Sequence, residues 1–259
     1  MLKIFEIIGR KIINFVKEMG EITLLFINVF RYFPRVIKDR RLIIEQMGIV
    51  GSDSLPLVIL IGSFTGAIAA LQATSIFAKF NMLNMAKSFV GASIATAVLT
   101  ELTPVLTALI IAGRVGGAMA AQIGTMKVSE QIDALDLMAI DKNRFLAMPR
   151  VLATFLMMPV LAVFSATVAL LGAFIITEIK FGLSYQEFFG SIVTYFKMSE
   201  VVACMIKSFI FGGIAALISC HVGFRTEGGA EGVGKSTVRA FTISAATILI
   251  IDALFGGIF

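Results

Sequence analysis

The sequence predicts an all-α integral membrane protein with an N-terminal amphipathic interfacial helix, five transmembrane helices and one short helix outside the membrane. Hydrophobic residues make up 58% of the 259 residues, and the mean hydropathy is +0.95. Charged residues make up only 15%, against about 25% in a typical soluble domain. A soluble chain of this size could not hide so much apolar surface, because its core is finite.

An amphipathic helix is predicted for residues 4–33. Apolar residues recur there in steps of three and four, the spacing of one helix face, while charged and amide side chains occupy the opposite face. Such a helix lies in the plane of the membrane interface, and Pro34 bends or ends it. We therefore assign residues 1–53 to an interfacial helix and a linker. The alternative is a helix packed on a soluble core.

Five transmembrane helices are predicted in residues 54–259. The first covers 54–78, which contains no charged residue and is about 37 Å long as a helix, enough to cross a hydrocarbon core of about 30 Å. Its small residues Gly62, Gly66 and Ala70 form a ridge for close packing, either within the chain or between subunits. The other four spans lie within 88–123 and at 151–177, 201–222 and 240–259.

Lysine and arginine residues determine the predicted orientation, because these cations are enriched in cytoplasmic segments. With the N-terminus inside, sixteen of them fall in inner segments and four in outer segments. The inner segments are 1–53, 122–150 and 222–239, and the outer segments are 78–93 and 178–200, with a short surface helix at 181–198. We expect a cytoplasmic N-terminus and a periplasmic C-terminus. The net charge of +5 is spread over loops, so no nucleic-acid partner is expected.

The segment "GAEGVGKST", Gly229–Thr237, matches the phosphate-binding pattern G-x-x-x-x-G-K-[ST]. A real phosphate-binding loop follows a buried strand and opens a helix, whereas both flanks here are membrane spans. Asp252, the acid that would hold Mg²⁺, lies about 24 Å along a helix from the loop. We therefore interpret residues 223–237 as a cytoplasmic glycine-rich turn. The alternative is an NTPase that uses Gly229–Thr237.

A short cytoplasmic helix is predicted at about residues 127–140, between the second and third spans. Ser129 can cap it, and Ile132, Leu135 and Met138 or Ala139 form one apolar side. Such a helix can present a surface to a motor protein. The alternative is an ordinary amphipathic helix in a loop.

The stretch "ELTPVLTALIIAGRVGGAMAAQIGTMKVSEQIDALDLMAID", Glu101–Asp141, resembles the signature region of MlaE/YrbE-type permeases, which serve lipid-transporting ABC systems with MCE-domain proteins. The segment "GGAEGVGKST" lies where that family has a similar glycine stretch before its last helix. The resemblance covers nearly the whole chain, although residues 1–50 match only as an amphipathic helix.

The resemblance implies a homodimeric permease in the bacterial inner membrane that moves phospholipid or a related lipid. Its implied partners are a cytoplasmic ABC ATPase that binds ATP and Mg²⁺, a small accessory subunit on that ATPase, and an MCE-domain lipid-binding protein. No cofactor, metal or catalytic residue is expected on this chain. The cytoplasmic helix becomes a coupling helix, whose implied ATPase contacts are Glu130, Gln131, Asp133, Ala134 and Leu135. The implied lipid cavity at the dimer interface is lined by Leu71, Gln72, Ile76 and Phe77.

The sequence departs from the family pattern at three places. Thr103 stands where the family often has Gly, and Gln122 where it often has Glu. The pair Lys235-Ser236 replaces a more usual pair without lysine, and this replacement alone creates the phosphate-loop match.

Four charged residues lie inside predicted spans, where each costs a few kcal/mol unless it is paired. Counting helix turns, Glu101, Lys207 and Asp252 lie at similar depths, so we expect Lys207 to pair with one or both acids. Arg114 lies near the inner boundary, where it can extend toward the headgroups. These charges could shape a cavity or serve as structural ion pairs. They could also make the protein an ion- or proton-coupled carrier.

Overall fold

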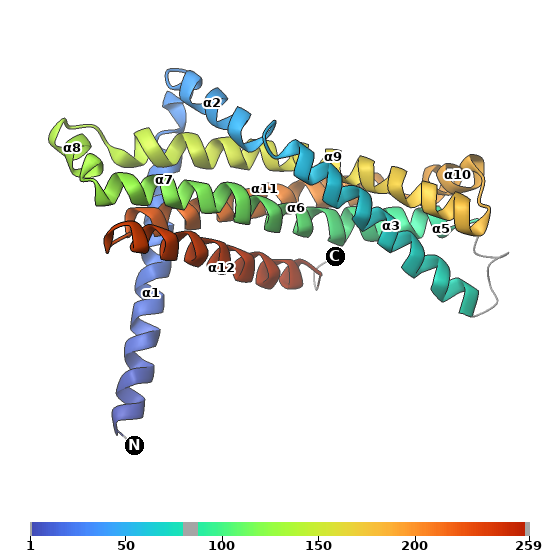
Figure 1. Cartoon of the computed structure of the whole chain (residues 1–259), viewed down its shortest axis with the longest axis horizontal. Coiled ribbons are helices and arrows are strands. Elements are labelled where there is room, and N and C mark those ends of the chain that lie inside the picture. Colours follow the sequence, from blue (N-terminus) through green and yellow to red (C-terminus); the bar gives the residue numbers. More distant parts are fainter. Residues whose placement is uncertain (1, 80–87, 257–259) are drawn as a thin grey trace.

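The computed structural model of the chain describes residues 2–79 and 88–256, and every regular element in these ranges is helical. Five helices are long and apolar enough to cross a membrane, in agreement with the all-α membrane fold expected from the sequence. They run side by side along one axis (Figure 1). Residues 80–87 of the first outer segment and residues 257–259 of the last predicted span lie outside the described residues.

The five spans agree with the predicted ones and extend beyond most of them by several residues. The first span is α3 (Leu55–Lys79), and the second is the continuous helical segment Val90–Val128. The third begins in a π-helical turn, η4 (Asn143–Ala147), and continues as α9 (Met148–Phe181). The last two are α11 (Met198–Phe224) and α12 (Gly229–Gly256).

Two π-helical turns interrupt the second span. It is built from α5 (Val90–Ala97), η2 (Val98–Leu102), α6 (Thr103–Ile111), η3 (Ala112–Gly116) and α7 (Gly117–Val128). A π turn contains one residue more than an α turn. The hydropathy of the segment therefore predicts its length but not its interruptions.

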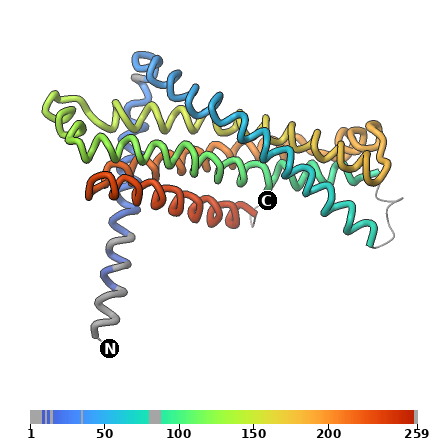
Figure 2. Tube along the Cα trace, viewed as in Figure 1, coloured from blue at the N-terminus to red at the C-terminus, as the bar shows by residue number. Residues whose placement is uncertain are grey.

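Helix α1 (Leu2–Arg31) crosses the bundle steeply instead of running along it (Figures 1 and 2). This orientation suits a helix in the membrane plane. A short 3-10 turn (Phe33–Arg35) containing Pro34 ends it, after which α2 (Arg40–Val50) packs along α9 and leads toward α3. The sequence predicted only a linker there. Few of the residues of α2 are buried, so its hydrophobic pattern is weak.

Glycine contacts join α3 closely to α9. A Cβ on Gly66 would overlap the backbone of Ala169, and one on Gly62 would lie 2.9 Å from the Ser165 carbonyl oxygen. In the opposite direction, a Cβ on Gly172 would lie 2.6 Å from the Ser63 carbonyl oxygen. The small-residue ridge of the first span is therefore occupied within the chain.

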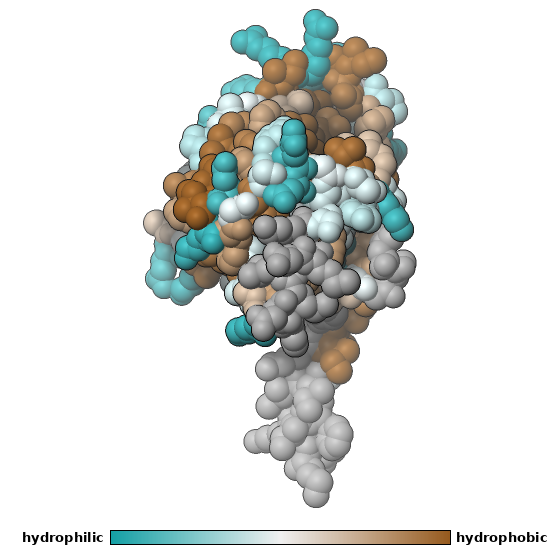
Figure 3. Space-filling model, turned by 90° about the vertical axis from the view of Figure 1, so that its right-hand side faces the viewer, coloured by the Kyte–Doolittle hydropathy of each residue, from teal (hydrophilic) through white to brown (hydrophobic). Residues whose placement is uncertain are grey.

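Different elements cap the two ends of the bundle. Helix α8 (Gln131–Leu137) and the α11–α12 connection lie at one end, and α10 (Tyr185–Tyr195) lies at the other (Figure 1). Helix α10 matches the predicted surface helix and begins with a capping box between Ser184 and Glu187. Hydrophobic side chains stay on the surface beside hydrophilic ones at the α10 end (Figure 3), as expected for a chain surrounded partly by lipid.

Candidate functional site

Helix α8 forms an exposed hairpin with the end of α7. Glu130 and Ala139, on either side of it, have left-handed backbone conformations with φ of 60° and 57°. Ile132 is buried and fixes the helix to the main core, and Leu135 is partly buried against the same core. The inward side therefore consists of these two residues. Of the implied ATPase contacts, Glu130, Gln131, Asp133 and Ala134 are exposed.

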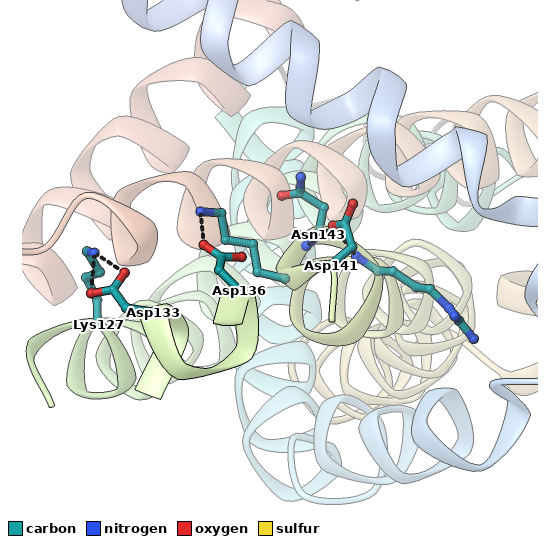
Figure 4. A network of polar contacts seen from close by, with 7 residues as sticks. Lys127, Asp133, Asp136, Asp141 and Asn143 are labelled. Carbon is teal, nitrogen blue, oxygen red and sulfur yellow. Dashed lines mark hydrogen bonds and ion pairs between the residues drawn. The ribbon is translucent and has the colours of Figure 1, made fainter. Parts of the chain in front are cut away.

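Ion pairs hold both flanks of α8 (Figure 4). Lys127 Nζ lies 2.9 Å from Asp133 Oδ1, and Lys142 Nζ lies 3.3 Å from Asp136 Oδ2. One of the implied contact residues, Asp133, is thus already paired within the chain, so its side chain also stabilises the hairpin.

The end of α8 exposes two large apolar side chains. Leu137 is 90% exposed and Met138 is 61% exposed. The sequence placed Met138 on the inward side of the helix, but α8 ends at Leu137 and the chain turns before Ala139. In the sequence, the two adjacent apolar residues Leu137 and Met138 near the end of the predicted helix could have indicated this exposed apolar surface. A polar cavity of about 300 Å³ lies beside it, lined by Asp136, Ala139, Ile140, Asp141, Lys142 and Asn143.

Asp141 connects the segment after α8 to the end of α1. It accepts a 2.6 Å hydrogen bond from the Tyr32 hydroxyl and bonds from the backbone N–H groups of Asn143 and Arg144. Burial raises the pKa of the Asp141 carboxyl, but these hydrogen bonds outweigh burial and hold the pKa below its ordinary value of 3.8. Arg144 in turn donates two 2.9 Å hydrogen bonds to Asp39. The segment after α8 is therefore tied to α1 and α2.

Three of the four predicted intramembrane charges meet. Lys207 Nζ lies 3.1 Å from Glu101 Oε1 and 2.9 Å from Asp252 Oδ1, and it also donates to the Thr100 carbonyl oxygen at 2.9 Å. The predicted pairing of Lys207 is thus confirmed for both acids. Lys207 is 3% exposed. The side chain of Glu101 is half exposed and that of Asp252 is mostly buried.

Arg114 is not part of that cluster. It donates a 2.6 Å hydrogen bond to the Ser54 hydroxyl and lies 4.0 Å from Asp53. Its side chain is therefore bonded to the junction of α2 and α3, and its extension toward the headgroups stays a prediction. A count of helix turns gives the depth of a residue but not the direction of its side chain.

The phosphate-loop match is helical. Gly229–Thr237 forms the first turns of α12, and only residues 225–228 connect it to α11. The predicted glycine-rich turn at 223–237 is therefore too long, because the small residues of the segment continue the last span. Lys235 pairs with Glu231, and the Ser236 hydroxyl accepts a 2.8 Å hydrogen bond from Thr226. Asp252 contacts Lys207 instead of this segment.

Three of the four implied lipid-cavity residues lie on the exposed side of α3. Leu71, Gln72 and Ile76 are exposed, whereas Phe77 is partly buried and makes an edge-to-face contact with Phe89, with centroids 5.4 Å apart. Within residues 2–79 and 88–256, no group of three His, Cys, Asp or Glu side chains could hold a metal ion.

The family model described as Permease MlaE matches residues 43–258. The chain belongs to the MlaE permease family. A probable ABC transporter permease of Synechocystis is 38% identical over 212 residues, which cover 82% of this chain and 79% of that protein. A probable ABC transporter permease of Rickettsia prowazekii is 35% identical over 266 residues, covering 100% of this chain and 98% of the relative.

The Arabidopsis chloroplast protein TRIGALACTOSYLDIACYLGLYCEROL 1 is 35% identical over 228 residues, covering 87% of this chain and 64% of its own length. The present chain is thus a multi-pass membrane permease of an ABC transporter. ABC permeases work with an ATPase partner, so α8 is the coupling candidate.

Two of the sequence departures can now be located in the permease. The Gln122 side-chain oxygen accepts a 3.3 Å hydrogen bond from Arg150. The Arg150 cation therefore contacts a neutral amide at a position where an acid would form an ion pair. Thr103 is buried at the start of α6, and its hydroxyl has no hydrogen-bond partner among the described residues. Among the described residues, nothing offsets the burial of this hydroxyl inside the bundle.

Proposed function

We propose that this permease forms a homodimer in the bacterial inner membrane and moves phospholipid or a related lipid between that membrane and an MCE-domain protein. A separate ATPase subunit, with a small accessory subunit, binds ATP and Mg²⁺ and docks against α8. The N-terminus is cytoplasmic and the C-terminus periplasmic. The observation that carries the proposal is an exposed helix between the second and third spans of an MlaE-family permease.

The exposed end of α8 supports docking of a motor protein. Leu137 and Met138 offer apolar area, while Glu130 and Gln131 offer polar groups around it. An apolar centre with a polar rim is the usual composition of a protein interface. The local ion pair of Asp133 keeps the hairpin in place for such a contact.

A lipid substrate is supported by the exposed apolar face of α3. Phe64 and Ile68 are each 62% exposed, and Leu71 and Ile76 are exposed further along the same helix. Two copies of this face opposite one another would enclose an apolar space suited to acyl chains. The name of the Arabidopsis relative contains the name of a glycolipid, which agrees with a lipid substrate.

The ATPase assignment is tested with the permease and its ATPase in proteoliposomes that contain NBD-phosphatidylethanolamine, with the MCE-domain protein as acceptor. We expect lipid movement that needs ATP and the ATPase chain. Lys235→Ala should leave the rate unchanged, because Lys235 is exposed on a helix and paired with Glu231. Loss of ATP hydrolysis in Lys235→Ala would contradict this assignment and favour nucleotide chemistry on this chain.

A second candidate is an ion- or proton-coupled carrier, favoured by the contact of the buried Lys207 with Glu101 and Asp252. The same proteoliposomes distinguish it from the first. Lipid movement driven by a proton gradient without ATPase would favour the carrier. Density for an acyl chain between two copies of α3 in the purified complex would favour the homodimeric lipid permease.

A further inference from the structure

The corner between α1 and α2, residues 30–44, exposes cations and large apolar side chains together. Within residues 31–41 the sequence has five basic residues and one acid. Four of the basic side chains are exposed: Arg31, Lys38, Arg40 and Arg41. Between them lie Phe33, which is 57% exposed, and Ile37, which is 82% exposed.

Among the side chains that the structure describes, the four exposed cations of this corner have no acidic partner. Asp39, the acid among these residues, is engaged by two hydrogen bonds from Arg144. In the part of the chain that the structure describes, Arg31, Lys38, Arg40 and Arg41 form no side-chain hydrogen bond and no ion pair. By contrast, Lys127, Lys142 and Arg144, at the same end of the bundle, each contact an acid. These four side chains therefore form a concentrated cationic surface without an acidic partner among the described residues.

Its position corresponds to the ends of the candidate spans on the α8 side. Leu25 and Val29 of α1 and Ile43 and Val50 of α2 are buried in the main core and fix both arms of the corner. Asp39 meets Arg144, which lies in the first turn of the third span. The corner thus lies at the level where the spans begin, at the α8 end of the bundle (Figure 1).

We propose that the α1–α2 corner binds the headgroups of anionic phospholipids in the leaflet at the α8 end. The four cations contact headgroup phosphates, and Phe33 and Ile37 insert among the upper acyl chains. Alternation of cations with exposed apolar side chains is typical of surfaces that bind an anionic bilayer. The proposal concerns lipids around the permease and does not depend on the transported substrate.

The test uses the full-length permease in phosphatidylcholine nanodiscs that contain a small fraction of photoactivatable phosphatidylglycerol. A parallel sample contains photoactivatable phosphatidylcholine instead. After illumination, labelled peptides are identified by mass spectrometry. We expect residues 30–44 to be labelled about tenfold more by the anionic probe, since each basic residue near an anionic surface changes occupancy about fivefold in the ideal case.

The combined substitution R31Q/K38Q/R40Q/R41Q should lower anionic labelling of the corner to the level of the neutral probe. K180Q/K197Q is the matched control, because Lys180 and Lys197 are exposed cations at the α10 end. Thermal unfolding midpoints equal to the wild type show that both variants fold. If the folding of the fourfold variant fails, R40Q/R41Q alone should still reduce the anionic preference several-fold.

Equal labelling by the two probes in the wild type would overturn the proposal, as would an anionic preference that survives the fourfold substitution. The experiment is repeated with the ATPase complex. Persistent anionic labelling of the corner is the expected result. Loss of labelling together with crosslinks from residues 30–44 to the ATPase would show that a protein covers the corner, which also overturns the proposal.

Discussion

Replacing Gly66 by Ala tests the close contact between α3 and α9. The added Cβ would overlap the Ala169 backbone, and side-chain Cβ atoms essentially never approach another heavy atom nearer than 3.0 Å. The two helices must therefore separate by about 1 Å or more along their contact. Overpacking of a well-packed site costs about 1–3 kcal/mol. For a chain of this size, that cost corresponds to a fall in Tm of about 2–12 °C.

The assay is the thermal unfolding midpoint of the purified permease in detergent. Gly190→Ala is the matched control, because Gly190 lies inside α10 and an added Cβ meets nothing within 4 Å. It should raise stability by about 0.5–1 kcal/mol through helix propensity. Gly62→Ala, whose Cβ would lie 2.9 Å from a carbonyl oxygen, should cost less than Gly66→Ala. A Tm for Gly66→Ala equal to that of Gly190→Ala would refute the packing argument.

Three further predictions concern the residues around α8 and the contact between Lys207 and Asp252. Glu130→Lys should reduce co-purification of the ATPase and ATP-driven transport about tenfold or more, because it reverses an exposed charge of the proposed docking surface. Tyr32→Phe should lower stability by about 1 kcal/mol at neutral pH and by less below pH 3.8, since the stability due to the lowered Asp141 pKa is lost as pH falls through that pKa. Lys207→Met should cost about 3–5 kcal/mol, and adding Asp252→Leu should recover part of it.

Each of these predictions has a result that would contradict it. Unchanged ATPase binding by Glu130→Lys would remove that residue from the docking surface, and Glu130→Gln separates loss of charge from reversal. A Tyr32→Phe loss that grows as pH falls would show that the carboxylate is not the stabilised form. Additive effects of Lys207→Met and Asp252→Leu would mean that the two side chains do not interact.

The spans were predictable because hydropathy depends on composition over a long segment. The contact of Lys207 with two acids was also predictable, since depth along a helix follows from residue number and unpaired charges are costly in a bilayer. Arg114 shows the limit of that reasoning. Its depth could be counted from the sequence, but its partner Ser54 depends on which neighbouring helix its side chain faces. Phe77 shows the same limit. Its ring is partly buried because it packs against Phe89, a contact that the sequence does not predict.

The corner at α1 and α2 was only partly predictable. The apolar stripe indicated α1, but α2 has few buried residues and its packing partner α9 lies about a hundred residues further along the chain. The bond between Arg144 and Asp39 depends on the same long-range packing. Sequence patterns report the average environment of a segment, whereas these contacts depend on which segments meet.

The π-helical turns of the second span bear on how such a span can change length over evolution. Deleting one residue from a regular α-helix rotates everything beyond it by about 100° and moves every lipid-facing side chain to another face. Deleting one residue within η2 or η3 can instead convert the wide turn into an ordinary α turn. The rest of the span then keeps its faces. These two turns are the places where the second span can lose a residue without losing its register against its neighbours.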